Sequence, residues 1–393
     1  MVVTIIVLII LAGISISLVI GNNGIMQKAV KGREDYTGAA INEQMSLNKI
    51  EDYIENESSE LISIEEAKQK GILTEKTSVI DTNGNIIRVP QGFKIAADSG
   101  LNVTEGIVIE DNDIKTGIGN NRGNKYVWVP VGNGIKKNDG TTVDITLGRY
   151  AFADGTNDKD TNGNVLAKGT STLKQDAVNY TQEVEISYDN KRYKELATSR
   201  VGVASNGTDG LNTTALNLKG FVDSVKANGG YYIARYEASY GTDGKANSKV
   251  SNSYSGSNVE GKLWNNITQI NAATVSRNLY TGVNSDLINS YAWDTAIVYI
   301  QNFSGDTDYS RQNSLNTSLA NTGVNNDEKC KINDMASNTM EWTTEYCTYT
   351  DSSHAYPCAS RGGSYSSYYT YGRAYYYAEF SYDHVSFRCA LYM

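Results

Sequence analysis

Residues 361–393 read RGGSYSSYYTYGRAYYYAEFSYDHVSFRCALYM, and eight of the 23 residues from 364 to 386 are tyrosine. A tyrosine side chain offers a large amphipathic contact area with few rotatable bonds, and a phenol hydroxyl that is buried needs a hydrogen-bond partner. Eight phenols in one short segment therefore cannot all belong to a core. The stretch predicts an exposed, tyrosine-rich face.

The composition of the whole chain agrees with a polar recognition surface. The chain has 393 residues and a net charge of −9, and tyrosine outnumbers phenylalanine 28 to 6. The acidic balance, without a basic patch, excludes a nucleic-acid partner. The two histidines, His354 and His384, are too few for a three-histidine metal centre.

At the other end, residues 1–20 read MVVTIIVLIILAGISISLVI, without a charged residue. As a helix this run would be about 30 Å long, the thickness of the hydrocarbon layer of a bilayer. A signal peptide and a buried core helix are the alternatives to a membrane segment. From residue 21 to 60 the chain becomes polar, with apolar residues at helical spacing. We therefore expect one long helix over residues 1–55, apolar first and amphipathic later.

Between the two ends, local patterns predict a globular domain. Residues 216–227 and 286–303 have helical spacing, with Ser285 as a candidate N-cap for the second helix. Residues 231–237 are typical of a strand, and the Asn-Gly pair within 81–85 predicts a hairpin.

The first segment, VVTIIVLIILAGISISLVIGNNGIMQKA, resembles the N-terminal region of type IV prepilin-type proteins. The basic leader that precedes it in that family is not in this sequence, which leaves a filament subunit and a single-span anchor as alternatives. The resemblance implies that residues 1–54 contact membrane lipid or pilus subunits and that the head is extracellular, at the cell surface.

Six blocks, in the same order, resemble the formylglycine-generating-enzyme (sulfatase-modifying-factor) family. They are YVWVPVG (126–132), YYIARYEASYG (231–241), SYAWDTAIVYI (290–300), NDMASNTMEWTTE (333–345), RGGSY (361–365) and SFRCALYM (386–393). The resemblance implies a C-type-lectin-like domain over 86–393 with much irregular structure. With the helix 1–55 and a polar linker over 56–85, we expect an α+β chain whose variable-type region is 361–393.

The same resemblance bears on activity. Enzymes of that family use two cysteines after the Arg-Gly-Gly-Ser block, and the matching positions here are Ser367 and Gly372. Without a thiolate at either position we expect no catalysis of that type.

The resemblance also implies a structural calcium site before Glu-Trp. The matching positions are Asp334, Ser337, Thr339 and Glu341. Oxygen ligands suit calcium. The alternative is a turn in which the aspartate caps a backbone N–H. We expect no other cofactor.

All four cysteines follow residue 329, and an even number beyond a membrane segment predicts two disulfides. Four cysteines allow three pairings. We favour Cys347–Cys358 with Cys330–Cys389.

Residues 364–386 also resemble the variable region of lectin-fold proteins that retroelements diversify, where mutagenesis of Asn-type codons yields a restricted set of amino acids. Every residue in the range belongs to that set except Glu379. The ligand-binding residues that we predict are Tyr365, Ser367, Tyr368, Tyr369, Tyr371, Arg373, Tyr375, Tyr376, Tyr377, Phe380, Tyr382, Asp383 and His384.

Taken together, these features predict a non-catalytic, adhesin- or receptor-type protein at the cell surface that binds an external protein or glycan, with a protein favoured because tyrosine-rich surfaces suit protein partners. A structural pilin-like subunit without a separate ligand is the first alternative. An enzyme resembling the sulfatase-modifying factors is the second.

Overall fold

The structure is a computed structural model. It describes residues 61–111, 123–198, 201–202, 210–254, 259–312, 318–324, 326–351, 354–365 and 369–393. The chain divides into Met1–Ser58 and Ser59–Met393, and the fold given below is that of the second unit. The predicted helix 1–55 and its membrane or pilus contacts lie outside the described residues. In the part of the chain that the structure describes, no helix has the length and apolar character needed to cross a bilayer.

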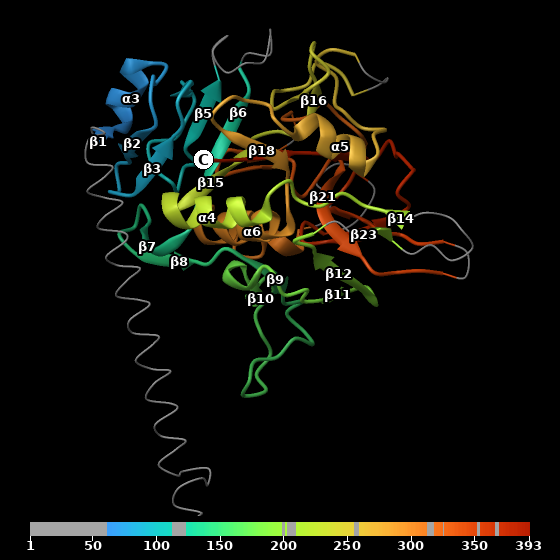
Figure 1. Ribbon diagram of the computed structural model, residues 1–393. Coiled ribbons are helices and arrows are strands. Elements are labelled where there is room, and N and C mark those ends of the chain that lie inside the picture. The colour runs from blue at the N-terminus through green and yellow to red at the C-terminus, as the bar shows by residue number, and fades with distance from the viewer. Residues whose placement is uncertain are drawn as a thin grey trace, which may run out of the picture. The chain divides into compact units, whose positions relative to one another are not determined.

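The described part of Ser59–Met393 is a mixed α/β fold made mostly of sheets, with few helices (Figure 1). One six-stranded antiparallel sheet contains the C-terminal strand of the chain in its interior. In sheet order its strands are β18 (Asn284–Leu287), β25 (Cys389–Tyr392), β15 (Gly230–Ala234), β6 (Lys125–Pro130), β5 (Val108–Asp111) and β4 (Phe93–Ile95).

A second six-stranded sheet carries the tyrosine-rich region. Its strands, in order, are β11 (Ile186–Tyr188), β12 (Lys191–Glu195), β21 (Met340–Cys347), β22 (Cys358–Arg361) and β23 (Arg373–Tyr376), with β24 (Val385–Phe387) parallel to β21. Strands that are far apart in sequence are therefore neighbours. For example, β12 pairs with β21, and Tyr193 lies opposite Cys347.

Two longer helices pack against these sheets. Helix α4 (Leu218–Asn228) lies on β15 and β25, and helix α6 (Ser290–Phe303) packs on β6, β21 and the strand β9 (Gly148–Phe152). The side chain of Asn289 caps α6 by accepting a hydrogen bond from the N–H of Ala292 at 2.9 Å. The helix predicted from residue 286 therefore begins four residues later, because Ser285 and its neighbours pair with β25. A third helix, α5 (Gln269–Ser276), packs on β18 and β21.

The predicted linker 56–85 is folded from Leu61 onward. Three strands with a short helix form a small sheet of their own: β1 (Leu61–Ser63), α3 (Ile64–Lys70), β2 (Thr77–Ile80) and β3 (Ile86–Val89). Ile62 and Val79 are fully buried, and this burial of apolar side chains is the reason that the segment is ordered. The predicted Asn-Gly hairpin joins β2 to β3, with Gly84 at a φ of 84°, where a glycine meets no steric cost.

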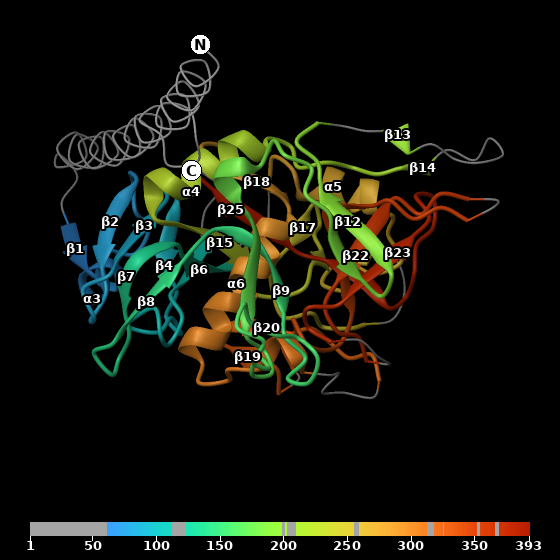
Figure 2. The ribbon, with the colours of Figure 1, turned by 90° about the horizontal axis from the view of Figure 1, so that it is seen from below.

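Short strand pairs account for much of the remaining chain. They are β7 (Gly132–Lys136) with β8 (Thr142–Ile145), β9 (Gly148–Phe152) with β10 (Ser171–Asp176), β13 (Val201–Gly202) with β14 (Gly210–Leu211), β16 (Ser239–Tyr240) with β17 (Ala246–Asn247), and β19 (Glu328–Lys329) with β20 (Ile332–Asn333). Figure 2 shows β9 beside α6, against which it packs.

The predicted disulfides are not formed: all four cysteines are buried and free. Cys347 and Cys358 lie on paired strands, but Cys358 is opposite Tyr346, so Cys347 points to the other face of the sheet. The thiol of Cys330 lies by Tyr299 on α6, whereas that of Cys389 lies by Ser276 on α5. The strand register therefore disfavours Cys347–Cys358, and the thiols of Cys330 and Cys389 lie beside different helices.

Candidate ligand-binding face

Strand β23 fastens the tail segment, residues 364–386, to the second sheet. It pairs with β22, and Arg373 lies directly opposite Arg361. Because side chains alternate along a strand, Arg373 and Tyr375 share one face of the sheet. Tyr376 points to the other face, where it packs against the main hydrophobic core. The tail segment is thus anchored by alternate side chains on both faces.

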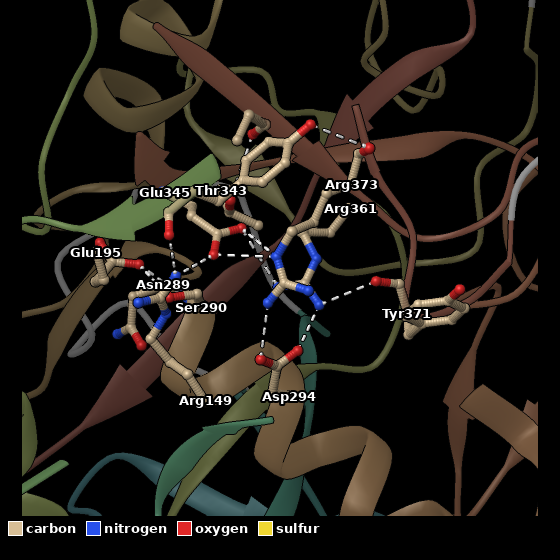
Figure 3. Close-up of polar contacts among 12 residues, drawn as sticks. Arg149, Glu195, Asn289, Ser290, Asp294, Thr343, Glu345, Arg361, Tyr371 and Arg373 are labelled. Atoms are coloured by element: carbon tan, nitrogen blue, oxygen red, sulfur yellow. Dashed lines mark hydrogen bonds and ion pairs between the residues drawn. The ribbon is translucent and has the colours of Figure 1, made fainter. Parts of the chain in front are cut away.

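Five charged side chains meet inside the fold next to β23 (Figure 3). We call them the charge network: Arg149, Asp294, Glu345, Arg361 and Arg373, all of which are buried. Arg373 donates through Nε to both oxygens of Glu345 at 3.1 Å and through Nη2 to Asp294 at 3.0 Å. Arg149 donates to Glu345 at 2.7 Å, and Arg361 is hydrogen-bonded to Asp294. The network therefore joins β9, β21, β22 and β23 to α6.

The charges of this network stabilise one another. Burial alone would raise the pKa of Glu345, but the guanidinium groups of Arg373, Arg361 and Arg149 outweigh it and lower the pKa to about 2. Burial would likewise lower the pKa of Arg373, and the two carboxylates raise it instead. An ion pair in a dry interior stabilises a fold only when its geometry and its additional hydrogen bonds are good. Most donors of the network are paired, but Nε of Arg149 and Nη1 of Arg361 are buried without a hydrogen bond among the described residues.

A third carboxyl, Glu195 on β12, lies next to the network. It accepts hydrogen bonds from the N–H and Oγ of Ser290 at 2.7 and 2.8 Å and from Oγ1 of Thr344 at 2.7 Å. Burial, with a smaller contribution from the charge of Glu345, raises the pKa of Glu195 to about 7. Near neutral pH the carboxyl of Glu195 is therefore present in both its protonated and its ionised form.

The predicted binding residues differ in exposure. Phe380, Tyr369 and Asp383 are exposed, and the first two expose 48% and 39% of their surface. Arg373 is buried in the charge network. Ser367 and Tyr368 lie outside the described residues. The half-buried residues are Tyr365, Tyr371, Tyr375, Tyr376, Tyr377, Tyr382 and His384.

Most of the half-buried rings touch one another in what we call the aromatic cluster, which also includes residues that the sequence did not single out. Tyr349 and Tyr356, from the loop between β21 and β22, contact Tyr375 at centroid distances of 4.8 and 5.4 Å. Lys191 on β12 lies 4.2 Å from the centroid of Tyr349. The other members are Tyr376, Tyr377, Phe380, Tyr382, His354 and His384.

The signal for these missed residues was weak. Tyr349 and Tyr356 lie in a second polar, tyrosine-containing stretch just before the tail segment. Only the antiparallel pairing of β21, β22 and β23 brings that loop beside Tyr375. A single sequence does not reveal such register.

A smaller aromatic group surrounds Tyr371. Its ring lies 5.3 Å from that of Tyr188, 6.2 Å from that of Phe152 and 5.8 Å from that of Tyr369. Arg311 donates to the hydroxyl of Tyr371 at 2.6 Å. Tyr371, Tyr188, Phe152 and Arg311 line a pocket of about 530 Å³, a volume within the usual range for small-molecule sites.

The residues predicted to bind calcium are held by protein groups. They are Asp334, Ser337, Thr339 and Glu341, all buried. Both oxygens of Glu341 accept hydrogen bonds from Arg388, and Asp334 accepts the N–H of Gly323 at 2.5 Å. Ser337 donates to Asp327 at 3.1 Å, and Thr339 donates to Glu237. These contacts favour the alternative of a hydrogen-bonded turn, and calcium binding stays a prediction.

Over the described ranges, no three His, Cys, Asp or Glu side chains come together in a way that would hold a metal ion. The guanidinium of Arg388 is instead the cation that contacts Glu341. It also donates to the carbonyls of Ala234 and Asn333, at 3.0 and 2.9 Å.

No protein-family model and no curated protein matches this chain. Two solved structures are weakly similar. The crystal structure of CarF matches at 13% identity with a TM-score of 0.30, over 42% of this chain and 87% of that chain. A P3c variant of the major tropism determinant matches at 13% identity with a TM-score of 0.27, over 84% of this chain and 98% of that chain. At these TM-scores neither likeness bears on function.

Proposed function

We propose that this chain is a non-catalytic ligand-binding protein that presents the tail segment and the aromatic cluster to an external protein partner. The carrying observation is a group of exposed and half-buried aromatic side chains on and beside β23, the strand that the buried charge network ties to β22 and α6. Rigid aromatic groups lose little conformational entropy when they bind, and a fixed scaffold beneath them lowers the cost of ordering the face. Phe380 and Tyr369 are the most exposed members and supply the first contacts.

The thiols of the chain support a non-catalytic role. Burial raises the pKa of Cys330, Cys347 and Cys389 to about 12, so each is a protonated thiol at neutral pH. Cys358 is buried as well, and its pKa is also raised. A protonated thiol in an apolar environment is a poor nucleophile and a poor metal ligand. Cysteine oxidation of the sulfatase-modifying-factor type therefore has no reactive thiolate among these residues.

The remaining parts of the proposal concern location. We infer that residues 1–54 hold the protein in a membrane or a pilus and that the head faces outward. The support for this inference is the uncharged apolar run at residues 1–20, whose length matches a bilayer. A retroelement origin of the tail segment belongs to the same proposal.

Partner capture by the full chain tests the proposed function. The purified protein is immobilised and exposed to extracts of host or neighbouring cells, and captured proteins are identified by mass spectrometry. We expect Phe380→Ser and Tyr369→Ser each to reduce capture of the same protein at least fivefold. Val178→Ser and Val250→Ser, which change side chains that are 53% and 50% exposed elsewhere, serve as matched controls.

The controls separate the alternatives. Equal loss of capture in the valine variants would indicate nonspecific adhesion and would refute partner binding by the tail segment and the aromatic cluster. Capture of a glycan, lost on deglycosylation of the extract, would replace the protein partner. If the tail variants instead abolish filament assembly and no extract component is captured, the structural-subunit alternative holds.

A further inference from the structure

The pocket beside the tail segment is walled by aromatic side chains from three separate segments. Phe152 comes from β9, Tyr188 from β11 and Tyr371 from the tail segment. Tyr188 and Tyr371 meet edge to face, with an interplanar angle of 78°. Tyr371 is fixed because Arg311 donates to its hydroxyl and also lies 4.2 Å from its ring centroid. The walls are therefore pre-formed rather than dependent on a ligand.

Arg373 also lines this pocket, although only 3% of the residue is exposed. Its Nε is held by Glu345 and its Nη2 by Asp294. Its remaining nitrogen, Nη1, makes no hydrogen bond to any part of the chain that the structure describes. Glu345 and Asp294 thus fix the guanidinium of Arg373, and Nη1 is left to donate to an acceptor that enters the pocket. Such a donor gains most from an ionised acceptor.

The charge balance points the same way. The charge network contains three arginines and two carboxylates, so its formal charge is positive. The neighbouring Glu195 offsets this charge only when its own carboxyl is ionised. Asp158 and Asp189 also border the pocket, but both are exposed, and Asp158 lies 3.7 Å from Arg311, a second cation in the lining. Filling the pocket with a cation would leave the buried donor of Arg373 unsatisfied, whereas an anion satisfies it.

We propose that this pocket receives a carboxylate of the protein partner, carried by an acidic side chain or by a chain terminus. The carboxylate accepts from Nη1 of Arg373, and the atoms next to it lie between Tyr188 and Tyr371. The inference rests on the proposed function and names the chemistry that the face selects. A peptide carboxylate is favoured over a sugar acid because the aromatic cluster beside the pocket has the composition of a protein interface.

Calorimetry on the full chain with small probes tests this proposal. N-acetylglutamate α-amide supplies a side-chain carboxylate, N-acetylglycine a terminal one, and N-acetylglutamine amide the neutral isostere. Glucuronate represents a sugar acid, and N-acetyllysine amide represents a cation. We expect saturable binding of at least one of the two acidic peptide probes, at least tenfold tighter than that of the neutral, sugar and cationic probes.

Two variants connect that binding to the pocket. Arg373→Gln should weaken binding of the acidic probe at least tenfold, and Tyr188→Ser should weaken it at least threefold. Tyr254→Ser, which changes a 46%-exposed tyrosine elsewhere, should leave it unchanged. If Arg373→Gln lowers the melting temperature, only the Tyr188→Ser result is used to judge whether the probe binds in the pocket, because that variant leaves the charge network intact.

Three results would refute carboxylate binding in this pocket and leave the proposed function unaffected. The first is that neither acidic probe binds saturably, and the second is that the neutral, sugar or cationic probe binds as tightly or more tightly. The third is that Tyr188→Ser leaves binding of the acidic probe unchanged. Partner capture that depends on Phe380 and Tyr369 but not on Tyr188 would keep the face and reject the pocket. Probe binding that survives while no partner is captured would reject the protein partner instead.

Discussion

Arg361 and Arg373 are direct cross-strand partners on β22 and β23, and both are hydrogen-bonded to Asp294 on α6. Like charges directly opposite one another on a sheet are normally destabilising. Here the two oxygens of one aspartate are divided between the two guanidinium groups, and Glu345 contacts both. The counter-charge from α6 is thus what allows β23, and the tail segment with it, to pair with β22.

Removing that counter-charge should be costly. Asp294→Asn leaves two buried guanidinium groups short of one charge, and breaking a buried ion pair from one side typically costs about 3–5 kcal/mol. We expect a loss of this size in the free energy of unfolding measured with urea. Asp223→Asn removes the exposed Lys219–Asp223 pair and should have a much smaller effect, because solvent screens that pair. Equal effects of the two substitutions would contradict the role of Asp294.

The charge state of Glu195 predicts a pH dependence of stability. Its pKa is about 7 in the fold, against an ordinary value of 4.5. Between these values the folded state holds a proton that the unfolded state has released, so stability falls as the pH rises through the window and levels off above it. The contribution is about 3 kcal/mol at about 1.4 kcal/mol per pKa unit. Glu195→Gln should remove this part of the decline in urea unfolding between pH 4.5 and 7.

Other buried acids also titrate, so the difference between the wild type and Glu195→Gln is the informative quantity. Glu65→Gln, on the exposed surface of α3, is the matched control and should follow the wild-type profile. Glu345 has the opposite sign: with a pKa of about 2, its stabilisation is present above pH 4.5 and is lost as the pH falls toward 2. A Glu195→Gln profile parallel to that of the wild type would refute the assignment.

Chelation should leave the fold unchanged. Arg388 donates to both oxygens of Glu341, which favours the hydrogen-bonded turn over the calcium site. If the turn is the correct interpretation, EGTA and added calcium give the same melting temperature within about 1 °C, because a ligand without a site does not stabilise the fold. Differential scanning calorimetry measures this directly. A drop in EGTA that calcium reverses, and that Asp334→Asn abolishes, would instead establish the calcium site.

The four free thiols predict a simple chemical result. In the native protein Cys330, Cys347, Cys358 and Cys389 are buried, and their raised pKa values keep them protonated, so a thiol reagent such as DTNB should react with almost none of them. After unfolding in guanidinium without a reductant, all four should react. Fewer than four reactive thiols in the unfolded chain would indicate a disulfide.

Local patterns in the sequence predicted local structure well. The helical spacing at residues 216–227 corresponds to α4, the Asn-Gly pair to the β2–β3 turn, and the run at 231–237 to β15. Each of these signals depends on neighbours within a few residues, such as apolar spacing, a cap or a turn glycine. Interactions across the fold overruled the local pattern at Ser285, which pairs with β25 instead of capping a helix.

The sequence by itself determined that the tail segment holds more phenols than a core can satisfy. Among its described tyrosines Tyr369 is exposed and the others are half-buried. Only the tertiary structure decided that Arg373 turns inward, that Tyr349 and Tyr356 join the aromatic cluster, and that the cysteines stay apart. Composition sets how many polar groups need partners. Strand register and the position of α6 set which groups meet, and these arise from contacts between residues far apart in the chain.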